Sequence, residues 1–132
     1  MLTLALLVAA GGSTAASNRT TATRSIVGTY RVVTHDTGGP GAGMTFRARF
    51  RIKRFNRATG RFTGDGSQTT GGPYPLTITG TLRQSKVVMH VRDAAVGYTA
   101  TDRGRIESNG NITGTLSDTQ GNTGRWTMTR VR

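Results

Sequence analysis

The sequence predicts an all-β protein, a single antiparallel up-and-down barrel of about eight strands, and three observations support that prediction. Short runs of alternating apolar and polar residues recur between turn signals from residue 25 to the end. No segment after residue 24 keeps a helical period over three turns. The strands follow one another with tight connections, as neighbours in a barrel do. A β-sandwich is the alternative architecture.

The first 24 residues are unlike the rest of the chain. Residues 1–17 contain an apolar run followed by small residues, which is typical of a secretory signal peptide. This run is too short to span a bilayer. Residues 18–24 are polar and are predicted to lead into a barrel domain over residues 25–132. We therefore expect a secreted, extracellular protein.

The strongest strand pattern covers residues 44–55, where apolar residues alternate with arginine or lysine. This is the period of a strand with one face in a core and the other in water. The strand before it is predicted over residues 25–34, and the glycine-rich stretch 35–43 between them is predicted to be a surface loop. Residues 44–55 should therefore present a basic ladder to solvent.

The later strands are predicted from hairpin signals. Strands are expected over residues 61–67 and 76–82, and a two-residue loop at 84–85 turns the chain into the next strand. The strands over 97–107 and 111–117 are joined by a loop suited to a three-residue hairpin, and the last strand covers 123–132. The expected cross-strand pairs are Leu82 with Val87, Gly80 with Met89, Ile78 with Val91, Ile106 with Ile112, and Gly104 with Gly114.

Glycine recurs at core-facing positions, at Gly28, Gly80 and Gly114, within similar five-residue runs. Glycine weakens a strand, so this repetition indicates strong coiling or a large side chain lying across it. Trp126 is expected opposite Gly114 and could cover it. The largest side chains assigned to the barrel interior are Tyr30, Phe46, Phe50, Met89, Tyr98, Trp126 and Met128.

Asp102 shares the inward phase of Tyr98, although burying a lone carboxylate is expensive. Two interpretations are open. Arg130, which shares the phase of Trp126 and Met128, could form a buried pair with Asp102 at one mouth of the barrel. Alternatively, a bulge near Asp102 could turn its side chain to solvent.

The opening strand with Gly28-Thr29-Tyr30, the eight-stranded meander, and a last strand bearing Trp126 and Arg130 resemble the lipocalin and avidin barrels. Those families carry G-x-W in their first strand, and Tyr30 stands here in place of the tryptophan. The resemblance implies a barrel that can enclose a ligand cavity.

Charge gives the leading functional hypothesis. The chain has 18 basic and 6 acidic residues, a net charge of +12, which favours anionic partners. We expect a non-enzymatic binding module for anionic polymers or surfaces such as polysaccharide, lipid headgroups or nucleic acid. The residues predicted to bind the anion are Arg31, Arg47, Arg49, Arg51, Lys53 and Arg61.

The sequence contains no recognisable catalytic constellation. It has two histidines, no cysteine, and no cluster of histidines and acids, so neither an enzyme nor a metal or other cofactor is expected. One alternative function is a lipocalin-like carrier of a small apolar ligand inside the barrel. Another is a structural subunit of an extracellular assembly, in which residues 12–24 add a strand to a neighbouring protomer. A completely filled barrel interior would remove the carrier.

Overall fold

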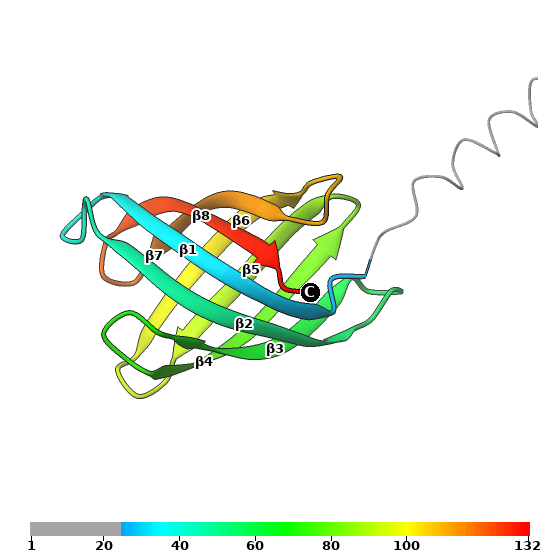
Figure 1. The fold of residues 1–132 in the computed structure, drawn as a ribbon, viewed down its shortest axis with the longest axis horizontal. Coiled ribbons are helices and arrows are strands. Elements are labelled where there is room, and N and C mark those ends of the chain that lie inside the picture. Colours follow the sequence, from blue (N-terminus) through cyan, green and yellow to red (C-terminus); the bar gives the residue numbers. More distant parts are fainter. Residues whose placement is uncertain (1–24) are drawn as a thin grey trace, which may run out of the picture.

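The computed structural model describes residues 25–132, and they form one closed barrel of eight antiparallel strands in sequential order (Figure 1). The barrel closes because the first strand pairs with the last. The prediction of an all-β up-and-down barrel is confirmed, and the sandwich is excluded. The predicted signal peptide and polar leader lie outside the described residues. The strands are β1 (Gly28–Gly38), β2 (Thr45–Phe55), β3 (Arg61–Gln68), β4 (Tyr74–Arg83), β5 (Lys86–Asp93), β6 (Tyr98–Ile106), β7 (Ile112–Asp118) and β8 (Thr123–Arg130).

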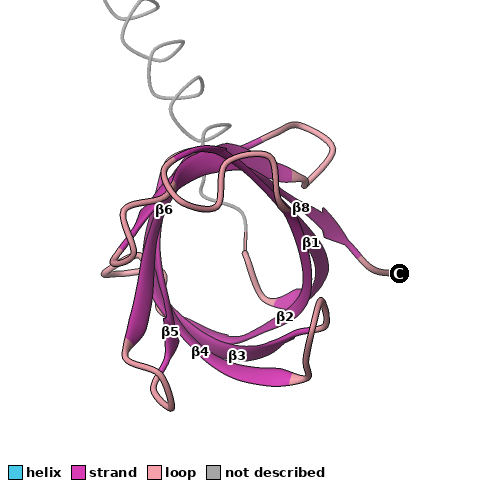
Figure 2. Cartoon of the chain, turned by 90° about the vertical axis from the view of Figure 1, so that its left-hand side faces the viewer, coloured by secondary structure: helices cyan, strands magenta, loops and turns pink. Residues whose placement is uncertain are grey.

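The strands form a ring around one axis when the barrel is viewed from its end (Figure 2). Four connections lie at that end: residues 39–44, 69–73, 94–97 and 119–122. The other connections and the start of β1 lie at the opposite end (Figure 1). Within residues 25–132 there is no helix long and apolar enough to cross a bilayer.

The predicted strand register is confirmed at every position for which the hairpin loops specified it. Gly80 lies opposite Met89, and Gly104 lies opposite Gly114. Trp126 lies opposite Gly114, as its five-residue loop implied. Short loops fix register because a slip of one residue would turn every inward side chain outward.

Two predicted loops are shorter than the sequence suggested. β1 continues to Gly38, so His35 and Asp36 belong to the strand rather than to a loop, and His35 pairs with Thr45 of β2. β4 begins at Tyr74, inside the stretch predicted as a connection. In both places cross-strand hydrogen bonding carries the ladder past residues with weak strand propensity.

Large side chains fill one half of the barrel. The fully buried group includes Tyr30, Phe62, Met89, Trp126 and Met128. Inward glycines make room for the rings: a Cβ on Gly104 would lie only 2.8 Å from Cζ2 of Trp126, and one on Gly80 would clash with Phe62. The indole nitrogen of Trp126 donates a hydrogen bond of 2.9 Å to the carbonyl oxygen of Thr115. Gly80 and Gly104 thus accommodate aromatic rings, whereas a Cβ on Gly114 would clash with the backbone of Arg103 and Gly104.

Arg130 and Tyr30 close this filled end. The Tyr30 hydroxyl donates to the carbonyl oxygen of Ile26 at 2.7 Å, and Arg130 donates to that hydroxyl at 2.9 Å. Arg130 also donates to the carbonyl oxygens of Val27 and Ser25, at 2.8 and 3.3 Å. These bonds tie the segment before β1 across the barrel end and bury Ile26 completely. Burial raises the pKa of Tyr30, although the Arg130 guanidinium partly offsets that effect.

Candidate ligand-binding site

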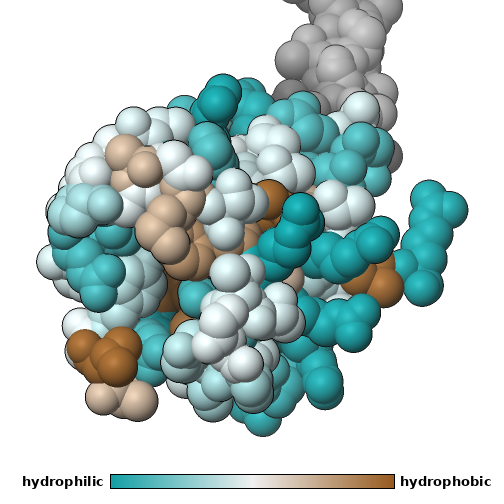
Figure 3. Space-filling model, turned by 60° about the vertical axis from the view of Figure 1, so that its left-hand side comes forward, coloured by the Kyte–Doolittle hydropathy of each residue, from teal (hydrophilic) through white to brown (hydrophobic). Residues whose placement is uncertain are grey.

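The other half of the barrel is open and contains a cavity of about 330 Å³. A space-filling view from near that end shows apolar residues within a recess surrounded mostly by more hydrophilic ones (Figure 3). The aliphatic and aromatic side chains that line the cavity include Val32, Phe46, Phe50, Leu76, Val91 and Leu116.

Small inward residues explain why the cavity is open. Ala48 on β2 and Ala100 on β6 line the cavity with small side chains. In the filled half, the inward positions carry larger side chains such as Phe62, Trp126 and Met128. Two apolar side chains on the cavity lining remain exposed: Tyr74 is 44% exposed and Val96 is 69% exposed. Concave, mostly apolar surfaces with a few polar groups are the usual form of small-molecule sites.

The charged side chains that line the cavity are all acidic. Four of the six acids in the chain line it, and no lysine, arginine or histidine of the described residues does. These acids are Asp36, Asp93, Asp102 and Asp118, which come from four different strands. An acidic interior therefore lies inside a protein whose net charge is +12.

The Asp118 carboxylate accepts several hydrogen bonds at the open end of the barrel, which we call the mouth. Its Oδ1 accepts hydrogen bonds from the backbone nitrogens of Gln120 and Asn122, both at 2.9 Å. Its Oδ2 accepts from the Tyr98 hydroxyl at 3.2 Å and from the Asn122 side chain at 3.1 Å. Asn122 in turn accepts from the backbone nitrogen of Gly41 at 2.7 Å, which links two mouth loops. Both carboxylate oxygens of Asp118 are thus occupied by hydrogen bonds within the chain.

Burial and the nearby carboxylate of Asp118 raise the pKa values of both Tyr98 and Asp36. Burial raises the pKa of Tyr98, and the charge of Asp118 and its hydrogen bond to Tyr98 raise it further. Burial also raises the pKa of Asp36, again assisted by Asp118, while His35 acts in the opposite direction. Asp93 accepts a bond of 3.1 Å from the backbone nitrogen of Ala95 and shapes the 94–97 loop.

Asp102 differs from the other three acids. Its side chain is 4% exposed, and its backbone partners on either side are Met89 and Leu116. Of the buried side-chain nitrogen and oxygen atoms in residues 25–132, only Oδ1 of Asp102 lacks a hydrogen-bond partner. Burial raises the pKa of Asp102 to about 7, because the charged form loses its hydration.

Both sequence-based interpretations of Asp102 are wrong. The pair with Arg130 does not form, because Arg130 bonds to Tyr30 and to backbone carbonyls at the filled end. No bulge turns Asp102 outward either, since β6 pairs in continuous register with β5 and β7. The carboxyl group instead faces the cavity.

The side chains assigned to the interior all lie on the inner face of the barrel. Tyr30, Met89, Trp126 and Met128 lie in the filled half, whereas Phe46, Phe50 and Tyr98 line the cavity. Sequence reasoning missed Asp36, Asp93 and Asp118 as cavity residues. Asp36 and Asp118 do continue the inward phase of Val32 and Leu116, but both were assigned to loops.

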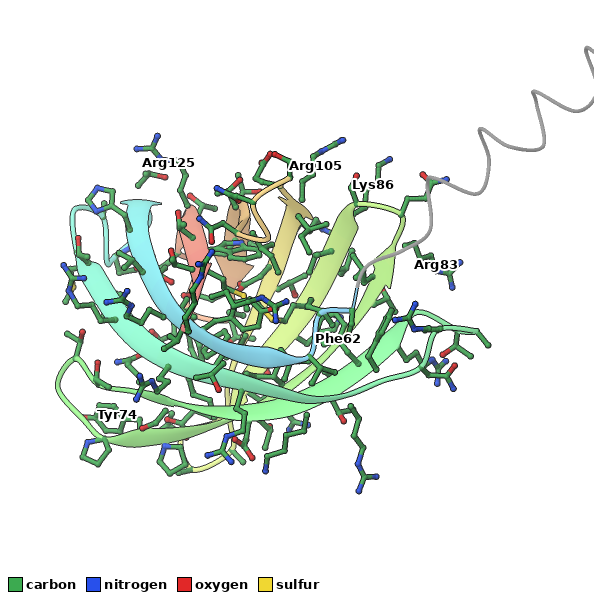
Figure 4. The ribbon with its side chains drawn as sticks, turned by 45° about the vertical axis from the view of Figure 1, so that its right-hand side comes forward. Phe62, Tyr74, Arg83, Lys86, Arg105 and Arg125 are labelled. Atoms are coloured by element: carbon green, nitrogen blue, oxygen red, sulfur yellow. The ribbon has the colours of Figure 1, made fainter. Side chains whose placement is uncertain are left out.

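The residues predicted to bind anions are exposed on the outer surface. Arg31 of β1 lies directly opposite Arg49 of β2, and Arg47 and Arg51 flank Arg49 on the same face. Lys53 forms an ion pair with Asp65, the one ion pair among residues 25–132. Arg61 is exposed at the start of β3. Arg83, Lys86, Arg105 and Arg125 also point away from the barrel (Figure 4), so basic residues lie on several of its sides.

Residues 25–132 contain no cluster of typical metal-binding side chains. In the part of the chain that the structure describes, no three histidine, cysteine or acidic side chains are grouped so that they could hold a metal ion. The four cavity acids therefore do not form a set of metal ligands.

The sequence matches no protein-family model and no curated protein. Among solved structures, a redesigned β-barrel, b11L5F_LGL, has a TM-score of 0.67 at 11% identity, covering 81% of this chain and 92% of its own. A de novo designed fluorescence-activating β-barrel has a TM-score of 0.62 at 12% identity, over 80% and 93%. A redesigned barrel, mFAP1, bound to DFHBI, has a TM-score of 0.59 at 16% identity, over 80% and 94%. At these identities the likeness concerns the fold alone.

Proposed function

We propose that this protein is a non-enzymatic carrier that binds a small ligand in the open half of its barrel. The observation that carries the proposal is the cavity of about 330 Å³, which combines apolar walls with a few polar groups. The binding of DFHBI by the similar barrel mFAP1 supports the idea that such a barrel can hold a small molecule. The apolar residues exposed around the cavity would contact a ligand as it enters.

The proposal can be tested with N-phenyl-1-naphthylamine, an uncharged probe whose fluorescence rises in apolar surroundings. Saturable binding to the wild-type protein is expected. Ala48→Phe should abolish or strongly weaken it, because the new ring would occupy the cavity that Ala48 lines. Thr79→Phe is the matched control, since Thr79 is exposed on the outer face of β4. Absence of saturable binding, or equal loss in both variants, would contradict the proposal.

A second candidate function is the binding of an anionic polymer by the outer face of β1 and β2. Its support is the juxtaposition of Arg31 and Arg49, with Arg47 and Arg51 beside them. Like charges this close repel one another, and a polyanion would relieve that repulsion. The two functions use different surfaces, one inside the barrel and one outside, so they can be tested separately. Under both proposals the protein acts outside the cell, after export directed by residues 1–17.

A further inference from the structure

The charge distribution of the barrel is the starting point. A chain with 18 basic and 6 acidic residues places four of its acids around one cavity, and none of the basic residues within 25–132 lies there. Low-dielectric walls strengthen the field of such acids inside a cleft. The cavity should therefore repel anions and favour a positively charged group, in contrast with the outer surface.

Three of the four acids lie at or near strand ends, and two of them, Asp93 and Asp118, accept hydrogen bonds there. Asp118 accepts bonds from two mouth residues and Tyr98, and Asp93 caps the turn that follows it. Asp36 ends the inward run of β1 beside the 39–44 turn. These groups supply negative charge at the rim.

Asp102, in contrast, does not lie at a strand end or beside a turn. It lies two residues inside Ala100, in the middle of β6, and lines the cavity with an unpartnered, buried Oδ1. Buried polar atoms in native proteins almost always have a partner, so an isolated one that faces a cavity indicates a missing partner. The partner should be a donor, and preferably a cationic one, because hydrogen bonds to a charged partner are roughly twice as strong as those between neutral groups.

The surrounding residues restrict what that donor can be. A metal ion is disfavoured, since residues 25–132 contain no grouping of three suitable ligands. The apolar and aromatic residues that line the same cavity as Asp102 include Phe50, Leu116 and Val91. A ligand that matches both features has a charged nitrogen at one end and an apolar body at the other.

We propose that the ligand of this cavity is a small organic amine, whose ammonium group donates a hydrogen bond to Asp102 and whose apolar body packs against the aliphatic and aromatic walls. The inference rests on the proposed carrier function and specifies its ligand class. Asp36, Asp93 and Asp118 assist by attracting the cation to the mouth, while Asp102 fixes its orientation.

The test compares 1-naphthylmethylamine with 1-naphthalenemethanol by isothermal titration calorimetry at pH 8. The two compounds share one ring system and differ in an ammonium versus a hydroxyl group. The wild-type protein should bind the amine at least tenfold more tightly. Asp102→Asn should remove most of that preference while leaving the affinity for the alcohol nearly unchanged. Asp65→Asn removes the same charge from the outer surface, where Asp65 pairs with Lys53, and should keep the preference.

The pH dependence provides a second measurement. The other titratable groups lining the cavity are Asp36 from β1, Tyr74 from β4, Asp93 from β5, Tyr98 from β6 and Asp118 from β7. None of them gains positive charge at any pH, so lowering the pH can only weaken the attraction for a cation. The amine preference should fall between pH 8 and 5.5 in the wild-type protein, as Asp102 takes up a proton, and fall less in Asp102→Asn.

The outcomes separate the two proposals. Equal binding of amine and alcohol by the wild-type protein, or a preference that survives in Asp102→Asn, would overturn the amine inference and leave the carrier function standing. If neither compound nor the uncharged probe binds, both proposals fail. A preference lost in Asp102→Asn and kept in Asp65→Asn supports the inference.

Discussion

The buried carboxyl group of Asp102 should make the stability of this barrel fall as the pH rises. Its pKa is raised from the ordinary value of 3.8 to about 7 by burial. Between these values the folded protein binds the proton that the unfolded chain releases, so each pH unit reduces the free energy of unfolding by up to about 1.4 kcal/mol. The contribution of Asp102 is therefore greatest in acid, is lost between about pH 4 and 7, and stays lost above that range.

The total loss is about 4 kcal/mol, which is large beside the 5–15 kcal/mol that is typical of a folded domain. Asp102→Asn has nearly the same shape but no ionisable group, so it should escape this loss. At pH 8.5 we expect the variant to be more stable than the wild-type protein by about 2–4 kcal/mol, allowing for the unpaired amide. Near pH 4 the two should be similar, or the variant slightly weaker.

Urea denaturation at pH 4, 6 and 8.5 measures these differences, provided that the slopes with urea stay equal. Asp36 has a pKa shifted in the same direction, so the comparison of wild-type and variant proteins isolates Asp102. Asp65→Asn controls for net charge, because the Asp65 side chain is 47% exposed. Parallel pH profiles for the wild-type protein and Asp102→Asn would refute the reasoning and imply that the carboxylate is solvated or paired.

Four further predictions concern other parts of the molecule. Gly104→Val should cost about 1–3 kcal/mol of stability or more, because a Cβ there meets the backbone carbonyl of Thr113 and the Trp126 ring. Thr115→Val, on the outer face, should change the stability by less than about 0.5 kcal/mol. Equal effects in denaturant melts would mean that the core can repack. Replacing Arg47, Arg49 and Arg51 by serine should weaken heparin binding and flatten its salt dependence more than replacing Arg83, Arg105 and Arg125; equal losses would show that the protein is merely basic. Arg130→Met should destabilise the barrel by roughly 2–4 kcal/mol, because its hydrogen bonds are lost. In the double variant its effect on the free energy of unfolding should add to that of Asp102→Asn within about 0.5 kcal/mol. A larger deviation from additivity would indicate that Asp102 and Arg130 do interact. Intact-mass analysis of exported protein should find a chain that begins near residue 17 or 18, and a retained Met1 would contradict export by cleavage.

The sequence predicted most of the fold because its strongest signals were local. The period-two pattern of β2 and the tight loops at 84–85 and 108–110 determine faces and register without long-range information. Of the repeated glycines, Gly80 did indicate where a large ring would pack, against Phe62, whereas Gly114 marks a close approach of two strands. Each of these features depends only on residues close in the chain or directly opposite across a hairpin.

The site was harder to predict because it is assembled at strand ends, where local signals are weakest. Asp36 follows threonine and histidine and precedes four glycines, so its neighbours resemble a loop even though β2 and β8 extend the strand. Asp118 also lies where a turn begins. For Asp102 the phase was predicted correctly but the partner was not. The predicted register already sets Asp102 level with Leu116 and Gly124, six residues along β8 from Arg130.

The two ends of the barrel use their polar groups in opposite ways. At the filled end, Arg130 is satisfied by a hydroxyl and two backbone carbonyls, so that end is closed by interactions within the chain. At the open end, Asp102 has no partner for Oδ1 and only small or apolar residues beside it. If stability alone governed both ends, an asparagine or an apolar residue at position 102 would be the better choice, since it removes the cost of a buried carboxylate. The acid is thus a destabilising group beside a cavity in which a bound cation would stabilise it, and this cost to the fold supports the proposed role of Asp102 in ligand binding.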